Sequence, residues 1–219
     1  GRVVSVGEGE GYAAIAGKKN AKVNYQVDLI DEIWEDRPVL SEEPAFNLDV
    51  KYAGETVASK LARIREEMKE AGTNVHVVST IDDICWTLNI RGNDIDFFPL
   101  VLSYGIITMY SFELYIDEKK LDDKLKAKLV KDGVNLHPYN DIYEDVKKFG
   151  SDVVAMIDPG KLNYALFNNI PENVKTVEKR NPAILMKAIK NPVEIENIRK
   201  AQIKDSVAHI RFMKWLKEN

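Results

Sequence analysis

Apolar residues in this chain recur at two spacings, and the two spacings alternate along most of its length. Over residues 55–71 the apolar positions lie three and four residues apart, which is typical of one face of a helix. Gly72 follows this segment and is expected to end it. Further helices are expected from Thr80 onward and over residues 118–131, 141–149 and 162–168.

Short apolar runs between these helices predict buried strands. The runs cover residues 74–79, 101–110, 112–116, 152–157 and 175–177. Residues 101–116 are too apolar for an exposed strand pair, so we expect them near the centre of a sheet. Strands that alternate with helices predict an α/β fold, a mixed β-sheet flanked by helices, with partial flanking segments at its two ends.

The first part of the chain has a different pattern. Apolar runs predict strands over residues 2–6 and 21–27, with a weak helix over 11–16 between them. Closely spaced glycines make this region poorly self-stabilising. Pro38 and Pro44 enclose an acidic stretch and mark a linker. We therefore expect the first part to be the tail of a larger unit.

The last segment predicts a long helix. Asn191 suits the N-cap, Pro192 the first helical position and Glu194 the acid of a capping box. A helix of about 26 residues, roughly 39 Å long, could follow. It carries many apolar residues, Trp215 among them, and is expected to need a partner. Because the chain starts without methionine and stops inside this helix, we expect it to be part of a longer polypeptide, called the parent below.

Composition and charge narrow the range of functions. The chain of 219 residues is 45% hydrophobic and 30% charged, as in soluble globular proteins. Its net charge of -4, with acids and lysines interspersed, argues against nucleic-acid binding. No apolar run is long enough to cross a membrane, and no secretory leader is present, so we expect no membrane association. The single cysteine, Cys85, excludes an internal disulfide and fits a cytoplasmic location.

The residue patterns contain no recognisable reaction centre. His76, His137 and His209 lack the neighbour spacing of a metal site, so each is interpreted as a structural or surface histidine. Asp82 and Asp83 are adjacent on a predicted helix, where neighbouring side chains diverge. We expect these two acids to interact with the positive end of the helix dipole rather than to act in catalysis.

Other candidate features are interpreted as structural. Cys85 lies in an apolar stretch and is expected to be a buried, inert thiol, with Trp86 beside it in the core. The Thr80 hydroxyl is expected to cap the first amides of its helix. The GEGEG run at residues 7–11 lacks the lysine of a phosphate loop, and its glutamates would repel phosphate.

Three stretches resemble the three-domain aminopeptidase P (Xaa-Pro aminopeptidase) family. The run LIDEIWEDRP at residues 29–38 is similar to the family's junction between its first and middle domains. The run IDDICWTLNIRGNDI at residues 81–95, followed by Pro99, resembles the signature of the middle domain. The run AIKNPVEIE at residues 188–196 resembles the opening helix of the pita-bread catalytic domain. The three stretches occur in the family's order.

The resemblance implies a domain layout. Residues 1–37 would be the C-terminal tail of the first domain, 38–182 the middle creatinase/prolidase N-terminal-like domain, and 183–219 the truncated start of the catalytic domain. The parent would hydrolyse the peptide bond between an N-terminal residue and a following proline. It would use two divalent metal ions, expected to be manganese, whose ligands lie in the later catalytic domain.

No position of this chain matches those ligands, so we expect it to bind no cofactor and to be inactive alone. The partners that the resemblance implies are the parent's own catalytic domain, a peptide substrate and a second copy in a homodimer. Trp215 and its apolar neighbours are expected to pack on the catalytic domain.

One loop within the middle-domain signature is a candidate for contact with substrate or with another domain. We nominate Arg91, Asn93 and Asp94 for this contact. Gly92 is expected to permit a tight turn with positive φ, and the Arg91 guanidinium could donate to a carboxylate or a carbonyl. In the alternative, structural role, Arg91 would anchor its own loop to Asp94 or Asp96.

Three hypotheses for function stay open. The chain is a non-catalytic segment of a metal-dependent Xaa-Pro aminopeptidase, or a stand-alone binding or scaffolding module that keeps the peptidase-like fold. A downstream reading frame with pita-bread metal ligands would separate these two. The third hypothesis, a small independent hydrolase, requires that this polypeptide cleave an Xaa-Pro peptide with added manganese.

Overall fold

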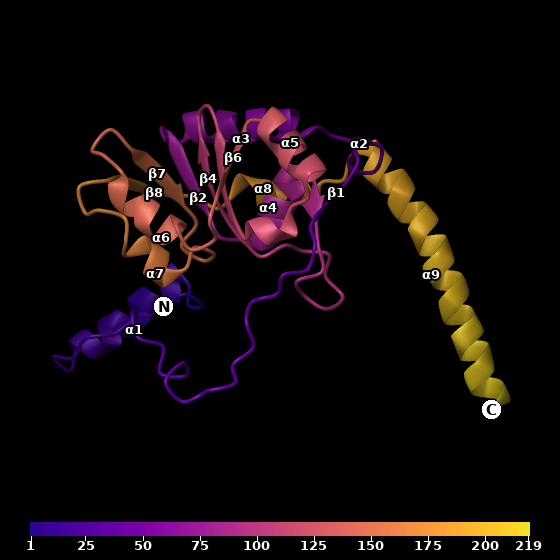
Figure 1. The fold of residues 1–219 in the computed structure, drawn as a ribbon, viewed down its shortest axis with the longest axis horizontal. Coiled ribbons are helices and arrows are strands. Elements are labelled where there is room, and N and C mark those ends of the chain that lie inside the picture. Colours follow the sequence, from indigo (N-terminus) through magenta and orange to yellow (C-terminus); the bar gives the residue numbers. More distant parts are fainter.

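The computed structural model describes residues 1–219 and is built around a six-stranded sheet (Figure 1). The order of strands across this sheet is β6-β5-β4-β2-β7-β8, and a separate small sheet pairs β1 with β3. The strands are β1 (Phe46–Asn47), β2 (Val75–Val78), β3 (Ile90–Arg91), β4 (Ser103–Thr108), β5 (Phe112–Ile116), β6 (Val134–His137), β7 (Val154–Ile157) and β8 (Lys175–Glu178).

The large sheet is mixed, as predicted. Strand β4 runs antiparallel to both of its neighbours, β2 and β5. The pairs β5–β6, β2–β7 and β7–β8 are parallel. The apolar segment at residues 101–116 supplies β4 and β5, which lie inside the sheet, because helices cover both of its faces and leave no wet side.

Helices flank both faces of the sheet, which confirms the predicted fold class (Figure 1). One core lies between the sheet and α3, α4, α5 and α8, and a second lies under α6 and α7. Ile106 and Ile107 of β4 enter different cores, because successive strand side chains point to opposite faces. The helices are α1 (Val6–Gly17), α2 (Val50–Ala53), α3 (Val57–Glu70), α4 (Ile81–Leu88), η1 (Glu118–Lys120), α5 (Asp123–Lys131), α6 (Ile142–Asp145), η2 (Val146–Lys148), α7 (Tyr164–Phe167), α8 (Pro182–Ala188) and α9 (Pro192–Glu218).

The N-terminal region differs from its prediction. Residues 2–6 and 21–27 form no strand, and helix α1 begins already at Val6. Its start is a capping box, in which the Glu8 amide donates to Ser5 Oγ at 3.3 Å and the Ser5 amide donates to Glu8 Oε2 at 3.0 Å. These two bonds satisfy helix N-terminal donors and outweigh the β preference of the apolar run.

Three local predictions are also wrong in detail. Strand β6 and helix α8 were not predicted. The helix predicted over residues 118–131 is broken in two, because the Asp122 carboxylate caps α5 by accepting the Leu125 amide at 2.7 Å. Thr80 precedes α4 but caps no amide, since its hydroxyl donates to Asp83 Oδ2 at 2.6 Å.

Residues 21–45 connect α1 to β1 without a helix or strand (Figure 1). Within this junction the Arg37 guanidinium donates to Asp28 at 3.0 Å and also to Asp31, which closes a turn. Several of its apolar side chains are exposed, including Ile33 and Trp34. The junction therefore leaves apolar surface uncovered between α1 and the sheet.

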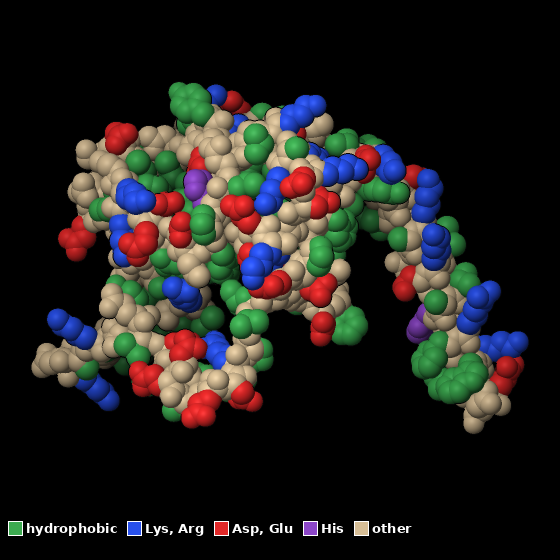
Figure 2. Space-filling model, in the orientation of Figure 1, with side chains coloured by type: hydrophobic (Ala, Val, Ile, Leu, Met, Phe, Trp, Pro, Cys, Tyr) green, Lys and Arg blue, Asp and Glu red, His purple; other side chains and the backbone are tan.

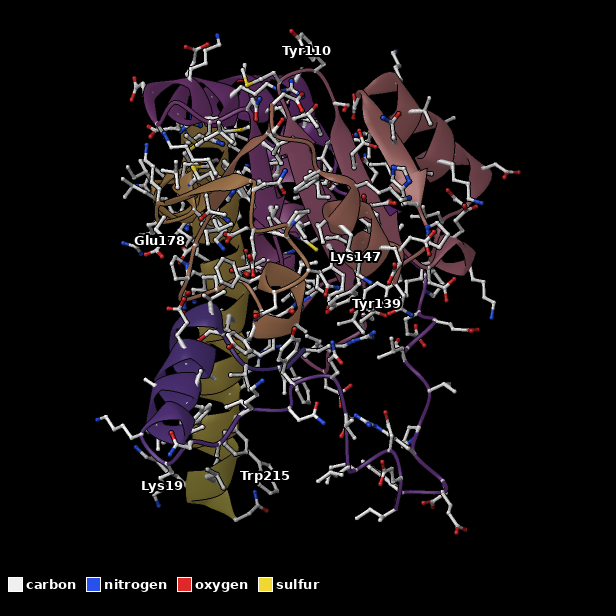
Figure 3. All side chains as sticks on the ribbon, turned by 90° about the vertical axis from the view of Figure 1, so that its left-hand side faces the viewer. Lys19, Tyr110, Tyr139, Lys147, Glu178 and Trp215 are labelled. Carbon is white, nitrogen blue, oxygen red and sulfur yellow. The ribbon has the colours of Figure 1, made fainter.

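Helix α9 has the predicted cap and length, and it projects away from the rest of the molecule (Figure 1). None of its 27 residues is buried. Near its free end Phe212 and Trp215 stack with ring centroids 6.3 Å apart, in an apolar patch that Figure 2 shows. Figure 3 places Trp215 at the end of the molecule opposite Tyr110. Neither α9 nor any other helix combines the length and apolar character that crossing a bilayer requires.

Candidate functional site

The nominated residues lie at the base of the loop that joins β3 to β4, which we call the β3–β4 loop (residues 92–102). Helix α4 ends at Asn89, whose φ of 52° turns the chain into β3. Strand β3 then pairs with β1, so that Arg91 lies opposite Phe46. In Figure 1 the loop extends from the body on the same side as α9.

Arg91 holds the loop to α4 and not to an acid. Its Nη1 donates to the Cys85 and Ile90 carbonyl oxygens, both at 2.8 Å. The Cys85 carbonyl lies in the last turn of α4, where backbone acceptors lack helical partners. The predicted anchor to Asp94 or Asp96 is therefore wrong, because carbonyls at the end of the helix are nearer than either carboxylate.

Asp94 is bound to a residue that the sequence did not single out. Its Oδ2 accepts the Lys120 ammonium at 2.5 Å and the Leu102 amide at 2.7 Å. The exposed fractions of the two side chains are 0% for Asp94 and 2% for Lys120. Asp94 Oδ1 is buried without a hydrogen-bond partner. This ion pair ties the base of the β3–β4 loop to η1.

Gly92 is required by close packing and not by a left-handed turn. It is not among the residues with positive φ, contrary to the prediction. A Cβ at this position would lie 2.7 Å from Val101 Cγ2 and 3.4 Å from the Leu100 carbonyl oxygen. The two ends of the loop therefore touch across Gly92, which leaves no room for a side chain.

Replacing Gly92 with alanine is expected to lower the free energy of unfolding by about 1–3 kcal/mol, because the added methyl overpacks this contact. The control is Gly11→Ala, since a Cβ there meets no atom within 4 Å. Gly11 lies inside α1, so its replacement is expected to be neutral or slightly stabilising. Urea denaturation of both variants measures the difference. Equal stability of the two would contradict the packing argument.

The tip of the β3–β4 loop is a strained and exposed aromatic pair. Phe97 has a φ of 66°, a conformation that aromatic residues rarely adopt. Its side chain is fully exposed, and Phe98 is 62% exposed. The Phe98 amide donates to the Ile95 carbonyl at 3.1 Å, which closes the tip. Backbone strain under an exposed aromatic side chain is typical of a contact site.

Asn93 is the nominated residue that reaches the surface, since its side chain is exposed while Arg91 is half-buried. Arg91 and Asp94 thus hold the loop from beneath, and Asn93 and the aromatic tip face outward. The structure brings the three nominated residues together in one loop, but it gives them different tasks.

The core beneath the loop agrees with prediction. Cys85 is fully buried, and burial raises the pKa of its thiol to about 11, so the thiol is inert at neutral pH. Trp86 is 5% exposed and lies in the core. The Lys60 ammonium lies 4.3 Å from the centroid of the Trp86 ring. It also donates to the Trp86 carbonyl at 2.8 Å and to Asn89 Oδ1 at 2.7 Å.

The paired acids of α4 converge, contrary to the prediction that they diverge. The Lys187 ammonium of α8 contacts the carboxylates of both Asp82 and Asp83, the latter at 2.7 Å. Asp83 is buried and also accepts the Asn181 amide group at 2.9 Å. One cation from α8 draws the two side chains together, so the cluster joins two helices.

The histidines lie far from one another in their roles. His76 is buried, with its ring nitrogens 3.1 Å from the Met156 carbonyl and 3.3 Å from Asn181 Oδ1. His137 pairs with Glu113 at 2.6 Å, and His209 is exposed on α9. No group of three or more His, Cys, Asp or Glu side chains is placed to hold a metal ion. The donor set of a metal pair is therefore not found in these residues.

The sequence matches the model of the Creatinase/Prolidase N-terminal domain family over residues 36–194, which include both sheets and every helix that packs on them except α1. The chain belongs to this family. In this creatinase/prolidase N-terminal domain the match runs from the end of the junction through the β3–β4 loop to the first turn of α9.

Similar proteins carry names of one kind. The domain and its flanking segments are 35% identical over 201 residues to the probable Xaa-Pro aminopeptidase P of Neurospora crassa. They are 36% identical over 229 residues to Xaa-Pro aminopeptidase 1 of Dictyostelium discoideum. These alignments cover 87% and 99% of this chain but 29% and 36% of the two relatives.

A solved structure has the same fold over almost the whole chain. The X-prolyl aminopeptidase of Caenorhabditis elegans, described as a cytosolic enzyme with a di-nuclear active site, matches with a TM-score of 0.92 at 30% identity. The match covers 99% of this chain and 36% of that one. The creatinase/prolidase N-terminal domain described here thus spans about a third of the length of the proteins that it matches.

Sequence reasoning missed two residues of this site. Lys120 lies 26 positions after its partner Asp94, in a lysine-rich stretch where nothing distinguishes it. Phe97 could have been found, because Phe97 and Phe98 form an apolar pair inside an otherwise polar loop. An apolar pair at that place is unusual for a solvated turn and favours a contact role.

Proposed function

We propose that this chain is the non-catalytic N-terminal and middle segment of a metal-dependent Xaa-Pro aminopeptidase. The parent hydrolyses the bond between an N-terminal residue and a following proline. The observation that carries the proposal is the likeness of 99% of the chain to about a third of an X-prolyl aminopeptidase. The domain division follows the same comparison, with residues 1–37, 38–182 and 183–219 as its three parts.

In this proposal the β3–β4 loop contacts the parent's catalytic domain or its bound peptide. Two features support it. The loop and α9 extend from the body on one side, with open space between them (Figure 1). Both present exposed aromatic side chains, Phe97 on the loop and Phe212 and Trp215 on the helix. Asn93 contacts the same neighbour, while Arg91 and Asp94 keep the loop in place.

The chemistry of hydrolysis belongs to the rest of the parent. The residues of this chain do not fit a metal pair, so the two divalent ions, manganese in our proposal, are held by the catalytic domain. The ions would activate the water that attacks the peptide bond. This chain contributes orientation of the catalytic domain and shape at the substrate entrance. A cytoplasmic location and a homodimeric parent complete the proposal.

The experiment compares the parent with the 219-residue chain. We expect the parent to cleave an Xaa-Pro peptide when manganese is added, and the 219-residue chain to show no turnover under the same conditions. Calorimetry of the 219-residue chain with manganese is expected to show no tight site. Two tightly bound ions, or cleavage by this chain alone, would contradict the proposal, and a parent without metal ligands would favour a scaffolding module. The mass of the parent in solution tests the homodimer.

Replacing Phe97 with alanine in the parent is expected to lower kcat/KM for an Xaa-Pro peptide by roughly 10- to 100-fold, because burial of a phenylalanine side chain contributes about 1.5–3 kcal/mol. The matched control is Tyr110→Ala. Tyr110 is 94% exposed and lies at the end of the molecule away from the loop and α9 (Figure 3). We expect its replacement to leave kcat/KM unchanged. Equal values for the two variants would remove the contact role from Phe97.

A further inference from the structure

The root of α9 is the feature from which we draw a further inference. Since no residue of α9 is buried, the packing of its apolar face does not fix its direction in this structure. The helix is held instead at its first two turns, which contact α2. The direction of a helix of 27 residues, roughly 40 Å long, is thus decided at one end.

Asn191 bonds to both helices at this root. Its Oδ1 accepts the Glu194 amide at 2.9 Å, which caps α9. Its Nδ2 donates to the Ala53 carbonyl at 2.8 Å, at the end of α2. The last carbonyls of a helix have no helical partner, so this amide satisfies an acceptor that would otherwise be free. One short side chain therefore joins the end of α2 to the start of α9.

Gly54 completes the joint. It follows α2 with a φ of 69°, a left-handed conformation that favours glycine. A Cβ here would lie 2.2 Å from Asn191 Oδ1. Since Asn191 is bonded on both sides, it cannot move away without losing one of its hydrogen bonds. Asn197 adds a weaker contact one turn later, where its Nδ2 lies 3.3 Å from the Lys51 carbonyl.

We propose that Gly54 and Asn191 form a positioning joint, which sets the direction of α9 relative to the sheet. A rotation of about 10° at the joint moves the far end of such a helix by roughly 7 Å. Resting on the proposed function, the joint thereby sets where the catalytic domain lies relative to the β3–β4 loop. The residues of the joint act through position and contact no reacting group.

The test is a distance measurement on the 219-residue chain. Spin labels at Lys131→Cys and Arg211→Cys, two exposed positions on α5 and α9, report the distance between the body and the helix. Cys85 is fully buried and does not compete for the label. We expect a narrow distance distribution for the otherwise unchanged chain.

Gly54→Ala is expected to shift or broaden this distribution by several ångströms, because the joint must open. The matched control is Gly72→Ala. Gly72 has a φ of 67°, nearly that of Gly54, but a Cβ there meets no atom within 4 Å. Both variants carry the same backbone strain, so a difference between them reports the contact with Asn191. Equal distributions in the two variants would overturn the proposal.

Asn191→Asp gives an independent test. Aspartate caps a helix as well as asparagine does, so α9 is expected to stay helical by circular dichroism. It has no amide to donate to the Ala53 carbonyl, and its charge lies near that oxygen. We expect the same broadening as for Gly54→Ala, and an unchanged distribution would overturn the proposal.

The parent supplies a second measurement. Gly54→Ala and Asn191→Asp are expected to lower kcat/KM for an Xaa-Pro peptide at least tenfold more than Gly72→Ala does. If the parent has no peptidase activity at all, the proposed function fails, whereas the distance distributions still decide on the joint. If the distributions broaden but kcat/KM is unaffected, the joint does not position the catalytic domain.

Discussion

Replacing Asp94 with alanine is expected to lower the free energy of unfolding by about 3–5 kcal/mol. The reason is the charge that remains. The Lys120 side chain is 2% exposed, and Asp94 is the carboxylate that it contacts. Without that carboxylate a buried ammonium and the Leu102 amide lose their acceptor. A buried ion that loses its partner costs more than the pair itself contributes.

Denaturation in urea measures this loss, and a double variant tests its cause. Asp94→Ala combined with Lys120→Met removes both charges, so we expect it to be more stable than Asp94→Ala alone. The control is Lys147→Met, because Lys147 pairs with Glu144 at 2.7 Å while its side chain is 47% exposed. That exposed pair is expected to contribute less than about 1 kcal/mol. A loss below that size for Asp94→Ala would contradict the argument.

The second large effect is a dependence of stability on pH that arises from Lys60. This side chain is 1% exposed. Burial lowers the pKa of Lys60 from 10.5 to about 8, although the nearby carboxylates of Glu194 and Glu55 act to raise it. Between pH 8 and 10.5 the unfolded chain therefore binds a proton at this residue that the folded chain has released. Stability is expected to rise with pH across that window.

The size of the rise is on the order of 3 kcal/mol, since one pKa unit corresponds to about 1.4 kcal/mol. Other groups titrate in the same range, including Tyr104, so the comparison must be with Lys60→Met. The measured quantity is the difference in free energy of unfolding between the unchanged chain and this variant. We expect the difference to grow in favour of the unchanged chain from pH 8 to 10.5. A constant difference would show that the pKa of Lys60 is not lowered.

Local sequence patterns determined much of the fold. Apolar spacing predicted α3, and the run over residues 101–116 predicted two central strands, because helix and strand periods are read within one element. Caps were predicted where every partner is local, as at Asn191 and Glu194. The same logic fails at Ser5, where a local capping box was present but an apolar run was given more weight.

Family membership was also within reach of the sequence alone, because the signature of the middle domain is a continuous run. The short helix α8 was not, since its seven residues have no strong period and it is stabilised by packing on α4. Strand β6 likewise depends on its parallel pairing with β5. Elements this short form only where a larger structure supplies their partners.

The tasks of the site residues were decided by the tertiary structure alone. The sequence placed Arg91 and Asp94 in one loop, but their partners are the end of α4 and Lys120 of η1. Hydrogen bonds and ion pairs between distant segments carry no periodic signal, because any donor in the chain can reach a given acceptor once the sheet has formed. Only folding, which excludes water from these groups, makes one partner out of many decisive.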